Sequence, residues 1–202
     1  MSDNRRQLGR VKITQLQPSG LIINTPKGYV YDPSRRMEVP MLELNQDGIE
    51  TVNERGERLL DIHHARHPDT HNDGDNAISI GFTSHYAEMR THFGDHMQDG
   101  VAGENIIIES NELVWLTNLG QQLIFQNPDS GKMVYLEVVK YATPCEEFSH
   151  FAANSVHERM PASELKAALQ FLGNGRRGFL LKLGENHKSA IIKPGDLVFS
   201  IG

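Results

Sequence analysis

The chain has 202 residues, with 20 Lys and Arg against 26 Asp and Glu, and therefore a formal net charge of −6 at pH 7. A general nucleic-acid binder carries a basic face and a high pI, so this charge balance argues against that class of protein. No stretch approaches the ~18 consecutive apolar residues of a membrane-spanning helix. The first ten residues are mostly polar and lack the apolar core of a secretion signal.

One cysteine is present, so no intramolecular disulfide can form and a reducing, cytoplasmic location is expected. The length favours a single domain over residues 1–202, since β-barrels often run that long. Residues 1–10 are expected to form a flexible N-terminal tail.

Short candidate strands, separated by turn residues, occupy most of the chain. Residues 11–17 and 21–25 flank a Pro18-Ser19-Gly20 turn, which predicts a hairpin. Residues 37–44 and 48–52 flank a second turn at 45–47. Further short strands are expected at residues 59–63, 77–80, 105–109, 112–116 and 123–126.

The strongest strand is expected at residues 132–140, where both faces are apolar. Such a strand belongs in a closed or covered sheet rather than at an exposed edge. Residues 179–183 and 197–201 alternate apolar and polar positions more cleanly and predict two further strands.

Two helices interrupt the strands. Apolar residues recur at helical spacing over residues 83–93, with Thr83 as N-cap and Gly94 as the stop. The same pattern over residues 165–172 starts near Pro161 and ends at Gly173. Many short strands with two isolated helices favour a mainly β fold, a barrel or sandwich with peripheral helices.

Cys145 follows the strongest strand, in the segment Thr143-Pro144-Cys145. Pro144 restrains the backbone and so the direction in which the thiol is presented. A cysteine placed in this way can ligate a soft metal as thiolate, or carry sulfur as a persulfide. The alternative is an inert, buried cysteine that acts as a small apolar side chain.

Two glycine-bearing segments are candidate ligand-binding loops. Gly103-Glu104-Asn105 enters a strand of three isoleucines, where glycine permits close approach to a ligand and Asn105 offers a donor and an acceptor. Gly175-Arg176-Arg177-Gly178 pairs two arginines, which suits a phosphate or another oxyanion. The alternatives are an ordinary loop before a strand and a solvated charged turn.

Histidine is concentrated in residues 63–71, where His63, His64, His67 and His71 fall within nine residues. Such a tract is typical of metal binding. Its spacing nevertheless matches neither HExxH nor paired CxxC. A polar histidine-rich loop is therefore the favoured interpretation, and a metal-dependent hydrolase remains an alternative.

In this order, the segments resemble the MOSC domain, named for the C-terminal domain of molybdenum cofactor sulfurases. The resemblance runs from about Val11 to the C-terminus. It rests on Gly103-Glu104-Asn105, Pro144-Cys145, Gly175-Arg176-Arg177-Gly178-Phe179 and Lys193-Pro194-Gly195-Asp196. The helix at residues 83–93 also falls where the family has one. The resemblance implies a closed, Greek-key-like β-barrel with two or more peripheral helices.

The resemblance also implies that the protein binds the molybdenum cofactor (molybdopterin). In this family the cysteine that matches Cys145 is regarded as the molybdenum ligand in amidoxime-reducing relatives, or as a sulfur carrier in sulfurase relatives. By the same analogy the cofactor pocket would be lined by Gly103, Glu104, Asn105, Pro144, Arg176 and Arg177.

The leading hypothesis is an oxidoreductase that reduces small N-hydroxylated or N-oxide substrates. It would need an external electron-donor reductase, because the chain has no flavin, haem or iron–sulfur motif. One alternative is a sulfur transferase with a Cys145 persulfide and a partner as sulfur donor. A second alternative is a non-catalytic cofactor-binding module.

The sequence departs from the family pattern where many relatives carry a Gly-Asp-Arg/Lys-His stretch. Here the chain has Asp61-Ile62-His63-His64, followed by a longer histidine-rich insertion.

Glu146 and Glu147 follow Cys145 directly and would raise the pKa of its thiol if their carboxylates lay close to it. We therefore predict that the loop at residues 173–178 lies beside Cys145, with Arg176 or Arg177 compensating this charge.

Overall fold

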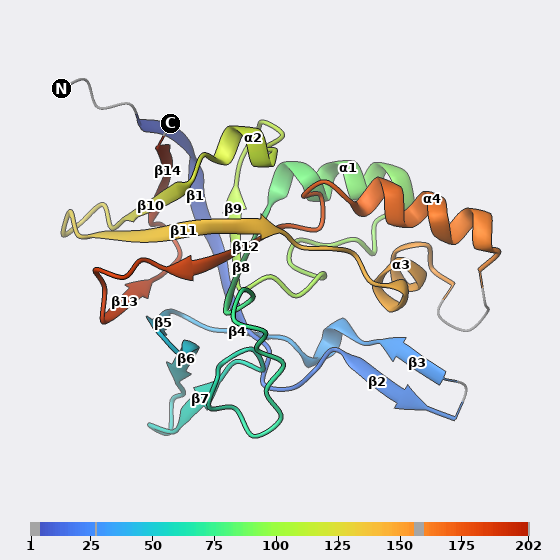
Figure 1. The fold of residues 1–202 in the computed structure, drawn as a ribbon, viewed down its shortest axis with the longest axis horizontal. Coiled ribbons are helices and arrows are strands. Elements are labelled where there is room, and N and C mark those ends of the chain that lie inside the picture. The colour runs from blue at the N-terminus through green and yellow to red at the C-terminus, as the bar shows by residue number, and fades with distance from the viewer. Residues whose placement is uncertain (1–4, 27, 156–159, 202) are drawn as a thin grey trace.

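The fold is a closed β-barrel with helices on its surface (Figure 1). The computed structural model describes residues 5–26, 28–155 and 160–201. Seven strands form the ring in the order β14-β10-β11-β12-β8-β9-β1, and β14 closes it by pairing with β1. The strands of the ring are β1 (Arg5–Leu16), β8 (Ile78–Phe82), β9 (Ile106–Glu109), β10 (Gln122–Gln126), β11 (Met133–Tyr141), β12 (Phe179–Leu183) and β14 (Leu197–Ile201). The expected mainly β, closed-barrel fold with peripheral helices is confirmed.

One pair in the ring, β8 with β9, is parallel, whereas the other pairings in the ring are antiparallel. Parallel neighbours cannot be joined by a tight turn and need a crossover segment. Here the crossover is α1 (Thr83–Phe93) followed by the loop at residues 94–105. This loop brings Gly103 and Glu104 back to the barrel directly before β9.

Smaller sheets and the remaining helices flank the barrel. A four-stranded sheet has the order β13-β5-β6-β7, and β2 pairs with β3 as a separate hairpin. These strands are β2 (Ile22–Thr25), β3 (Gly28–Tyr31), β5 (Leu42–Asn45), β6 (Gly48–Val52), β7 (Arg58–Leu60) and β13 (Ser189–Ile192), and the short β4 (Met37–Glu38) pairs with β1. The helices are α2 (Leu116–Leu119), α3 (Glu146–Ala152) and α4 (Ala162–Leu172), with a 3-10 turn η1 (Pro33–Arg35).

Two apolar clusters stabilise this arrangement. The larger one fills the barrel with inward-facing side chains such as Phe125, Leu136 and Leu181. The smaller one lies under the helices and includes Tyr86 and Phe148, with Cys145 packed against its edge. Each fully buried large apolar side chain contributes about 1.5–3 kcal/mol relative to an exposed one. The second cluster therefore fixes α1 and α3, and with them the segment that carries Cys145.

Local sequence patterns predicted several elements closely. The helix at residues 83–93, the strands at 179–183 and 197–201 and the hairpin of β5 with β6 are confirmed. The hairpin across Pro18-Ser19-Gly20 is wrong, because β2 pairs with β3 while β1 pairs with β14, β9 and β4. The strand expected at residues 112–116 is also wrong, since residues 110–115 form no strand and Leu116 begins α2.

The N-terminal residues differ from the expected tail. Residues 5–10 belong to β1, with Arg5 opposite Ile201 and Arg10 opposite Leu197 in β14. The rest of the expected tail, residues 1–4, lies outside the described residues. No helix in the described ranges is long and apolar enough to cross a membrane.

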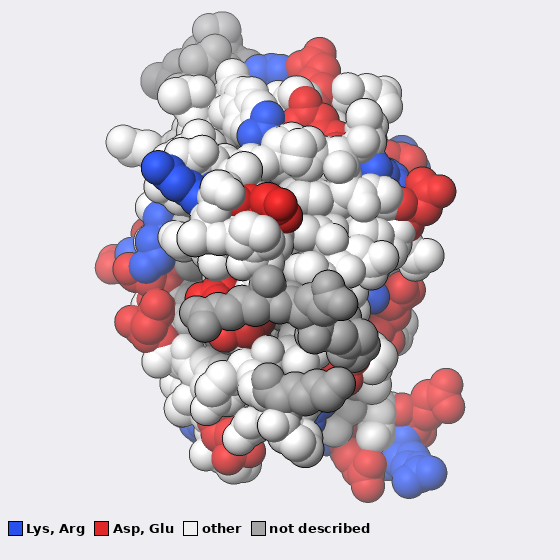
Figure 2. Space-filling view, turned by 90° about the vertical axis from the view of Figure 1, so that its right-hand side faces the viewer, with Lys and Arg blue, Asp and Glu red and all other residues white. Residues whose placement is uncertain are grey.

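Figure 2 shows the face that lies on the right in Figure 1, where the β2–β3 hairpin and the first turns of α4 lie. Most of the described surface on this face is uncharged, and acidic and basic side chains lie mainly around its edge. Charges of both signs are thus interspersed there.

Candidate functional site

A cavity of about 270 Å³ lies beside the barrel, where five segments of the chain meet. They are the residue after β1, the loop from β7 into β8, the residues before β9, the end of β11 with the residues after it, and the loop before β12 with the start of that strand. This cavity is called the Arg177 pocket below, after the arginine that lines it. Its lining residues are Gln17, His63, Asp73, Asn76, Ser79, Ala102, Gly103, Glu104, Lys140, Tyr141, Ala142, Thr143, Arg177 and Leu180.

Cys145 lies two residues beyond the lining residue Thr143 and is the N-cap of α3. Its Sγ accepts a hydrogen bond from the backbone N–H of Phe148 at 3.4 Å. The side chain of Cys145 is half-buried, and Pro144 before it is half-buried as well. The N-terminal turn of α3 thus holds the thiol at the end of β11, as expected from its place after that strand.

Burial raises the pKa of the Cys145 thiol above its usual value. The guanidinium of Arg177 and the N–H of Phe148 lower this pKa, and the carboxylate of Glu147 raises it. The desolvation of a thiolate outweighs the two favourable contacts. The free thiol is therefore protonated at neutral pH, although Arg177 compensates part of the cost.

Arg177 is the cation that links the pocket to Cys145. Its Nη2 donates to the carbonyl oxygen of Ala102 at 3.4 Å, and its Cζ lies 5.4 Å from the ring centroid of Phe148. Its Nε is buried and has no hydrogen-bond partner among the described residues. The prediction that the loop at residues 173–178 lies beside Cys145 is confirmed for Arg177.

Arg176, the neighbour of Arg177, points elsewhere. Its Nε donates to Glu88 Oε2 at 2.8 Å and its Nη1 donates to the carbonyl oxygen of Phe171 at 3.0 Å. Its guanidinium also lies over the rings of Trp115 and Phe171, at 5.0 Å and 4.6 Å from their centroids. Arg176 therefore fastens the loop to α1 and α4 and does not line the Arg177 pocket. Its assignment to cofactor binding stays a prediction.

Gly103 and Glu104 both line the pocket. Gly103 has φ +91°, and a Cβ there would lie 2.7 Å from Leu21 and 2.9 Å from the Gln17 side chain. Glu104 is 3% exposed, and its Oε2 accepts from the hydroxyl of Tyr86 at 2.6 Å. Its Oε1 is buried without a partner in the described part of the chain. Burial raises the pKa of Glu104, against the lowering effect of the Tyr86 hydrogen bond and of Arg177.

Asn105 has its side chain engaged within the protein. Its Nδ2 donates to Asp61 Oδ2 at 2.9 Å, and its Oδ1 accepts from the backbone N–H and the hydroxyl of Ser79 at 3.0 Å and 2.8 Å. Asn105 thus joins the loop after β7 to β8 and lies behind the pocket wall. Its direct contact with a cofactor stays a prediction.

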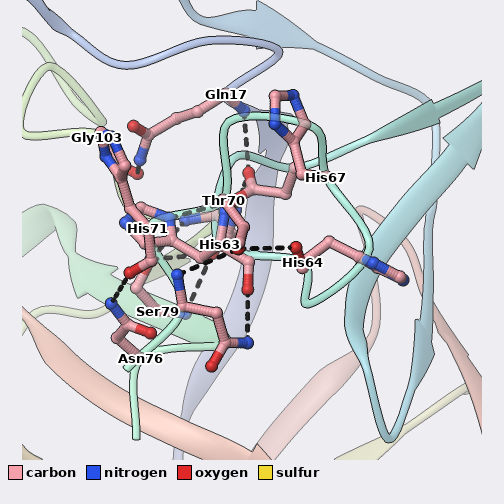
Figure 3. Close-up of polar contacts among 12 residues, drawn as sticks. Gln17, His63, His64, His67, Thr70, His71, Asn76, Ser79 and Gly103 are labelled. Carbon is pink, nitrogen blue, oxygen red and sulfur yellow. Dashed lines mark hydrogen bonds and ion pairs between the residues drawn. The ribbon is translucent and has the colours of Figure 1, made fainter. Parts of the chain in front are cut away.

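The histidine-rich loop is held by hydrogen bonds within the loop and by a contact with Pro18 (Figure 3). His64 accepts from the backbone N–H of Arg66 through Nδ1, and His67 makes a 3.2 Å contact through Nε2 with the carbonyl oxygen of Pro18. Figure 3 shows that His64 and His67 point to different sides of the loop. Within the described residues, no three His, Cys, Asp or Glu side chains gather in a metal-binding group. The histidine-loop hydrolase therefore gains no support.

The structure thus brings together the predicted residues Gly103, Glu104 and Arg177, with Cys145 at the edge of the same region. Several lining residues were not predicted. Gln17, Ser79 and Lys140 come from strands or strand ends, where nothing in their local sequence marks them as part of a pocket. His63 came from the segment predicted to be a polar histidine-rich loop, and its contact with Asp61, which fixes the imidazole, is visible only in the structure.

Comparisons with known proteins agree with this fold. The chain resembles the crystal structure of the YuaD protein from Bacillus subtilis, with TM-score 0.51 and 17% identity over 95% of this chain and 100% of that one. It also resembles YiiM from Escherichia coli, with TM-score 0.52 and 12% identity over 96% of this chain and 70% of that one. A search of curated proteins found no match.

The family itself is shown by the sequence. The model of the MOSC domain matches residues 60–199, which contain most of the pocket, Cys145 and Arg177. This range is more than half of the 202 residues. The chain therefore belongs to the MOSC domain family.

Proposed function

We propose that this protein binds the molybdenum cofactor in the Arg177 pocket, with Cys145 as the thiolate ligand of the metal, and reduces small N-hydroxylated or N-oxide substrates. One observation carries the proposal. A buried guanidinium with an unused N–H, that of Arg177, lines the pocket, and the soft sulfur donor Cys145 lies two residues beyond the lining residue Thr143, close enough for Arg177 to lower its pKa. MOSC domains as a family bind this cofactor, which supports the choice of ligand.

The pocket residues fit the chemistry of this group. A buried N–H without a partner costs about 1–3 kcal/mol, so the unused Nε of Arg177 favours an anionic oxygen such as that of a phosphate. The thiol of Cys145 is a soft ligand of the type that molybdenum accepts. The cavity of about 270 Å³ is close to the ~300 Å³ lower limit for small-molecule pockets, so part of a pterin cofactor would extend beyond it.

Cys145 and Arg177 would balance the charge at the site when the cofactor is bound. Because burial keeps the free thiol of Cys145 protonated, metal ligation must release this proton. Arg177 then faces the negative charge of the thiolate and offsets it. The bound cofactor supplies the two electrons of the reduction, which an external donor protein must replace. The overall reaction is R–NHOH + 2 electrons + 2 protons giving R–NH2 and water.

The alternative, sulfur transfer through a Cys145 persulfide, is less well supported. The thiolate is the nucleophile that takes up sulfur, and the raised pKa of Cys145 leaves little thiolate at neutral pH. A metal that binds the sulfur removes this difficulty, whereas a sulfur donor does not. The raised pKa of Cys145 therefore favours a metal ligand over a sulfur carrier.

The test is the molybdenum and pterin content of the protein purified from a molybdenum-replete host, beside Cys145→Ser. We expect near-stoichiometric molybdenum in the wild type and a loss in the variant. The loaded wild type should then reduce an N-hydroxylated amidine with reduced viologen as electron donor. Molybdenum that is absent from both proteins would contradict the proposal. A bound cofactor without turnover would instead indicate a binding module.

A further inference from the structure

The histidine-rich loop contributes one side chain to the Arg177 pocket, and the proposed function does not use it. This side chain is His63, which is 25% exposed and lines the cavity with Ser79 and Gly103. Figure 3 shows His63 with Gly103, Ser79 and His71 on one side of it and His64 and His67 on the other.

Asp61 holds the imidazole of His63 in place. The side chain of Asp61 is fully buried, and its Oδ1 accepts from the backbone N–H of His63 at 2.9 Å and contacts Nδ1 of His63 at 3.0 Å. Its Oδ2 accepts from the backbone N–H of Gln17 at 2.8 Å and from Nδ2 of Asn105 at 2.9 Å. Four contacts with nitrogen donors thus converge on this carboxylate, which acts as the acceptor in each. Nδ1 of His63 therefore carries a hydrogen.

This assignment fixes the chemistry of the other ring nitrogen. In a neutral imidazole with hydrogen on Nδ1, Nε2 is an acceptor. Among the described residues, the ring of His63 makes its hydrogen-bond contact through Nδ1, and Nε2 has no such contact. The ring of His71 stands edge-on at 6.4 Å between centroids. The other ionisable residues of the pocket are Asp73, Glu104, Lys140, Tyr141 and Arg177.

We propose that His63 is a ligand-binding residue of the pocket, whose Nε2 accepts a hydrogen bond from a ring N–H or amino group of a planar heterocycle. Under the proposed function, on which this inference rests, that heterocycle is the pterin of the cofactor. Asp61 is the positioning residue that presents the imidazole in the correct tautomer. A hydrogen bond at a well-ordered site of this kind changes affinity by about 10-fold or more.

Two substitutions separate the roles of the two ring nitrogens. His63→Asn keeps a polar atom near the position of Nδ1, where it can still reach Asp61, and removes Nε2. His63→Gln places its amide near the position of Nε2. If Nε2 binds the ligand, pterin retention falls about 10-fold in His63→Asn and is largely restored in His63→Gln. A purely structural role predicts the opposite order, because only the Asn variant preserves the contact with Asp61.

The readout is the pterin fluorescence of the oxidised extract per protein, together with the rate at which pterin is lost on dilution. The matched control is His67→Asn in the same loop, since the ring of His67 contacts Pro18 and does not line the pocket. We expect retention in this control to equal that of the wild type. Equal retention in His63→Asn, His63→Gln and the wild type would overturn the inference.

A second measurement keeps this test separate from the proposed function. If the purified wild type holds no cofactor, the proposed function fails, and His63 is then tested by titrating free pterin into the protein. Weaker binding to His63→Asn than to His63→Gln would support the inference. The same affinity for both would contradict it. Ring-nitrogen chemical shifts of ligand-free protein should also show hydrogen on Nδ1 of His63, and hydrogen on Nε2 would overturn the proposal.

Discussion

The guanidinium of Arg177 lies over the ring of Phe148, 5.4 Å from its centroid. Phe148 is also the residue whose backbone N–H donates to Sγ of Cys145. The contact therefore joins the glycine-rich loop before β12 to the first turn of α3, which Cys145 caps. A cation–π pair of this kind contributes about 0.5–2 kcal/mol, depending on its exposure. Phe148 thus fixes the position of the Arg177 guanidinium relative to Sγ of Cys145.

Arg177→Met should raise the pKa of the Cys145 thiol further, because Arg177 stabilises the thiolate. At a fixed pH near 8 the thiolate fraction should fall about 3- to 10-fold, which corresponds to up to one pKa unit. The rate of alkylation by iodoacetamide as a function of pH measures this shift. Arg177→Lys keeps the positive charge and should show a smaller change. An unaltered pH profile in Arg177→Met would show that the arginine does not act on the sulfur.

Glu147→Gln should shift the thiol pKa in the opposite direction. The carboxylate of Glu147 raises the pKa of Cys145, so its neutralisation should lower the pKa and increase the alkylation rate about 2- to 5-fold. Glu146→Gln is a matched control next to it, since Glu146 pairs with His150 at 3.6 Å instead. The idea fails if both variants change the rate equally.

The pH dependence of stability should reveal Glu104. Burial raises the pKa of this carboxyl in the folded state above the ordinary value of 4.5. Its contribution to stability is therefore fully present below about pH 4.5 and is lost as the pH rises through the folded-state pKa. Urea unfolding should show that the wild type loses stability relative to Glu104→Gln as the pH rises from 4.5. A difference that does not vary with pH would contradict the raised pKa.

Gly178→Ala should be much more destabilising than an ordinary glycine substitution. Gly178 has φ +112°, and a Cβ there would overlap the carbonyl oxygen of Ile80 in β8. We expect a loss of about 2 kcal/mol or more in the free energy of unfolding. Gly195→Ala is the control, because Gly195 has φ +96° but open space around it, and should cost about 1 kcal/mol. Equal losses would mean that the close approach to β8 is not the constraint.

Elements defined by local periodicity could be predicted from the sequence, whereas strand pairing could not. The apolar spacing of residues 83–93 depends only on the helix itself, so the range of α1 and its end at Gly94 were predicted, whereas the N-cap is Phe82 and not Thr83. In the barrel β1 pairs with β14 and β9, which lie far from it along the chain. No turn next to β1 in the sequence indicates these pairings. The helix α3 escaped prediction because its seven residues make only about two turns, too short for the spacing of Phe148, Phe151 and Ala152 to establish a helical period.

In the candidate site, too, the sequence predicted where residues lie along the chain but not where their side chains point. The position of Cys145 after a strong strand was a sound guide to its place in the fold. Arg176 and Arg177 are adjacent and chemically alike, yet only Arg177 lines the pocket, because the tight turn points the two side chains in different directions. Asn105 was correctly placed before β9, but its amide is satisfied by Asp61 and Ser79. Side-chain direction depends on tertiary contacts, which a single sequence does not contain.

The pairing of β1 with β14 has a consequence for folding. The hydroxyl of Ser200 reaches the carbonyl oxygen of Arg6 across a separation of 194 residues. Closing so long a loop carries a large entropic cost, and folds dominated by such distant contacts fold slowly. The barrel therefore cannot close until its last strand has joined its first. Until then β1 and β14 each have one unpaired edge, and the period before closure is when newly made chains are most exposed to aggregation and most dependent on chaperones.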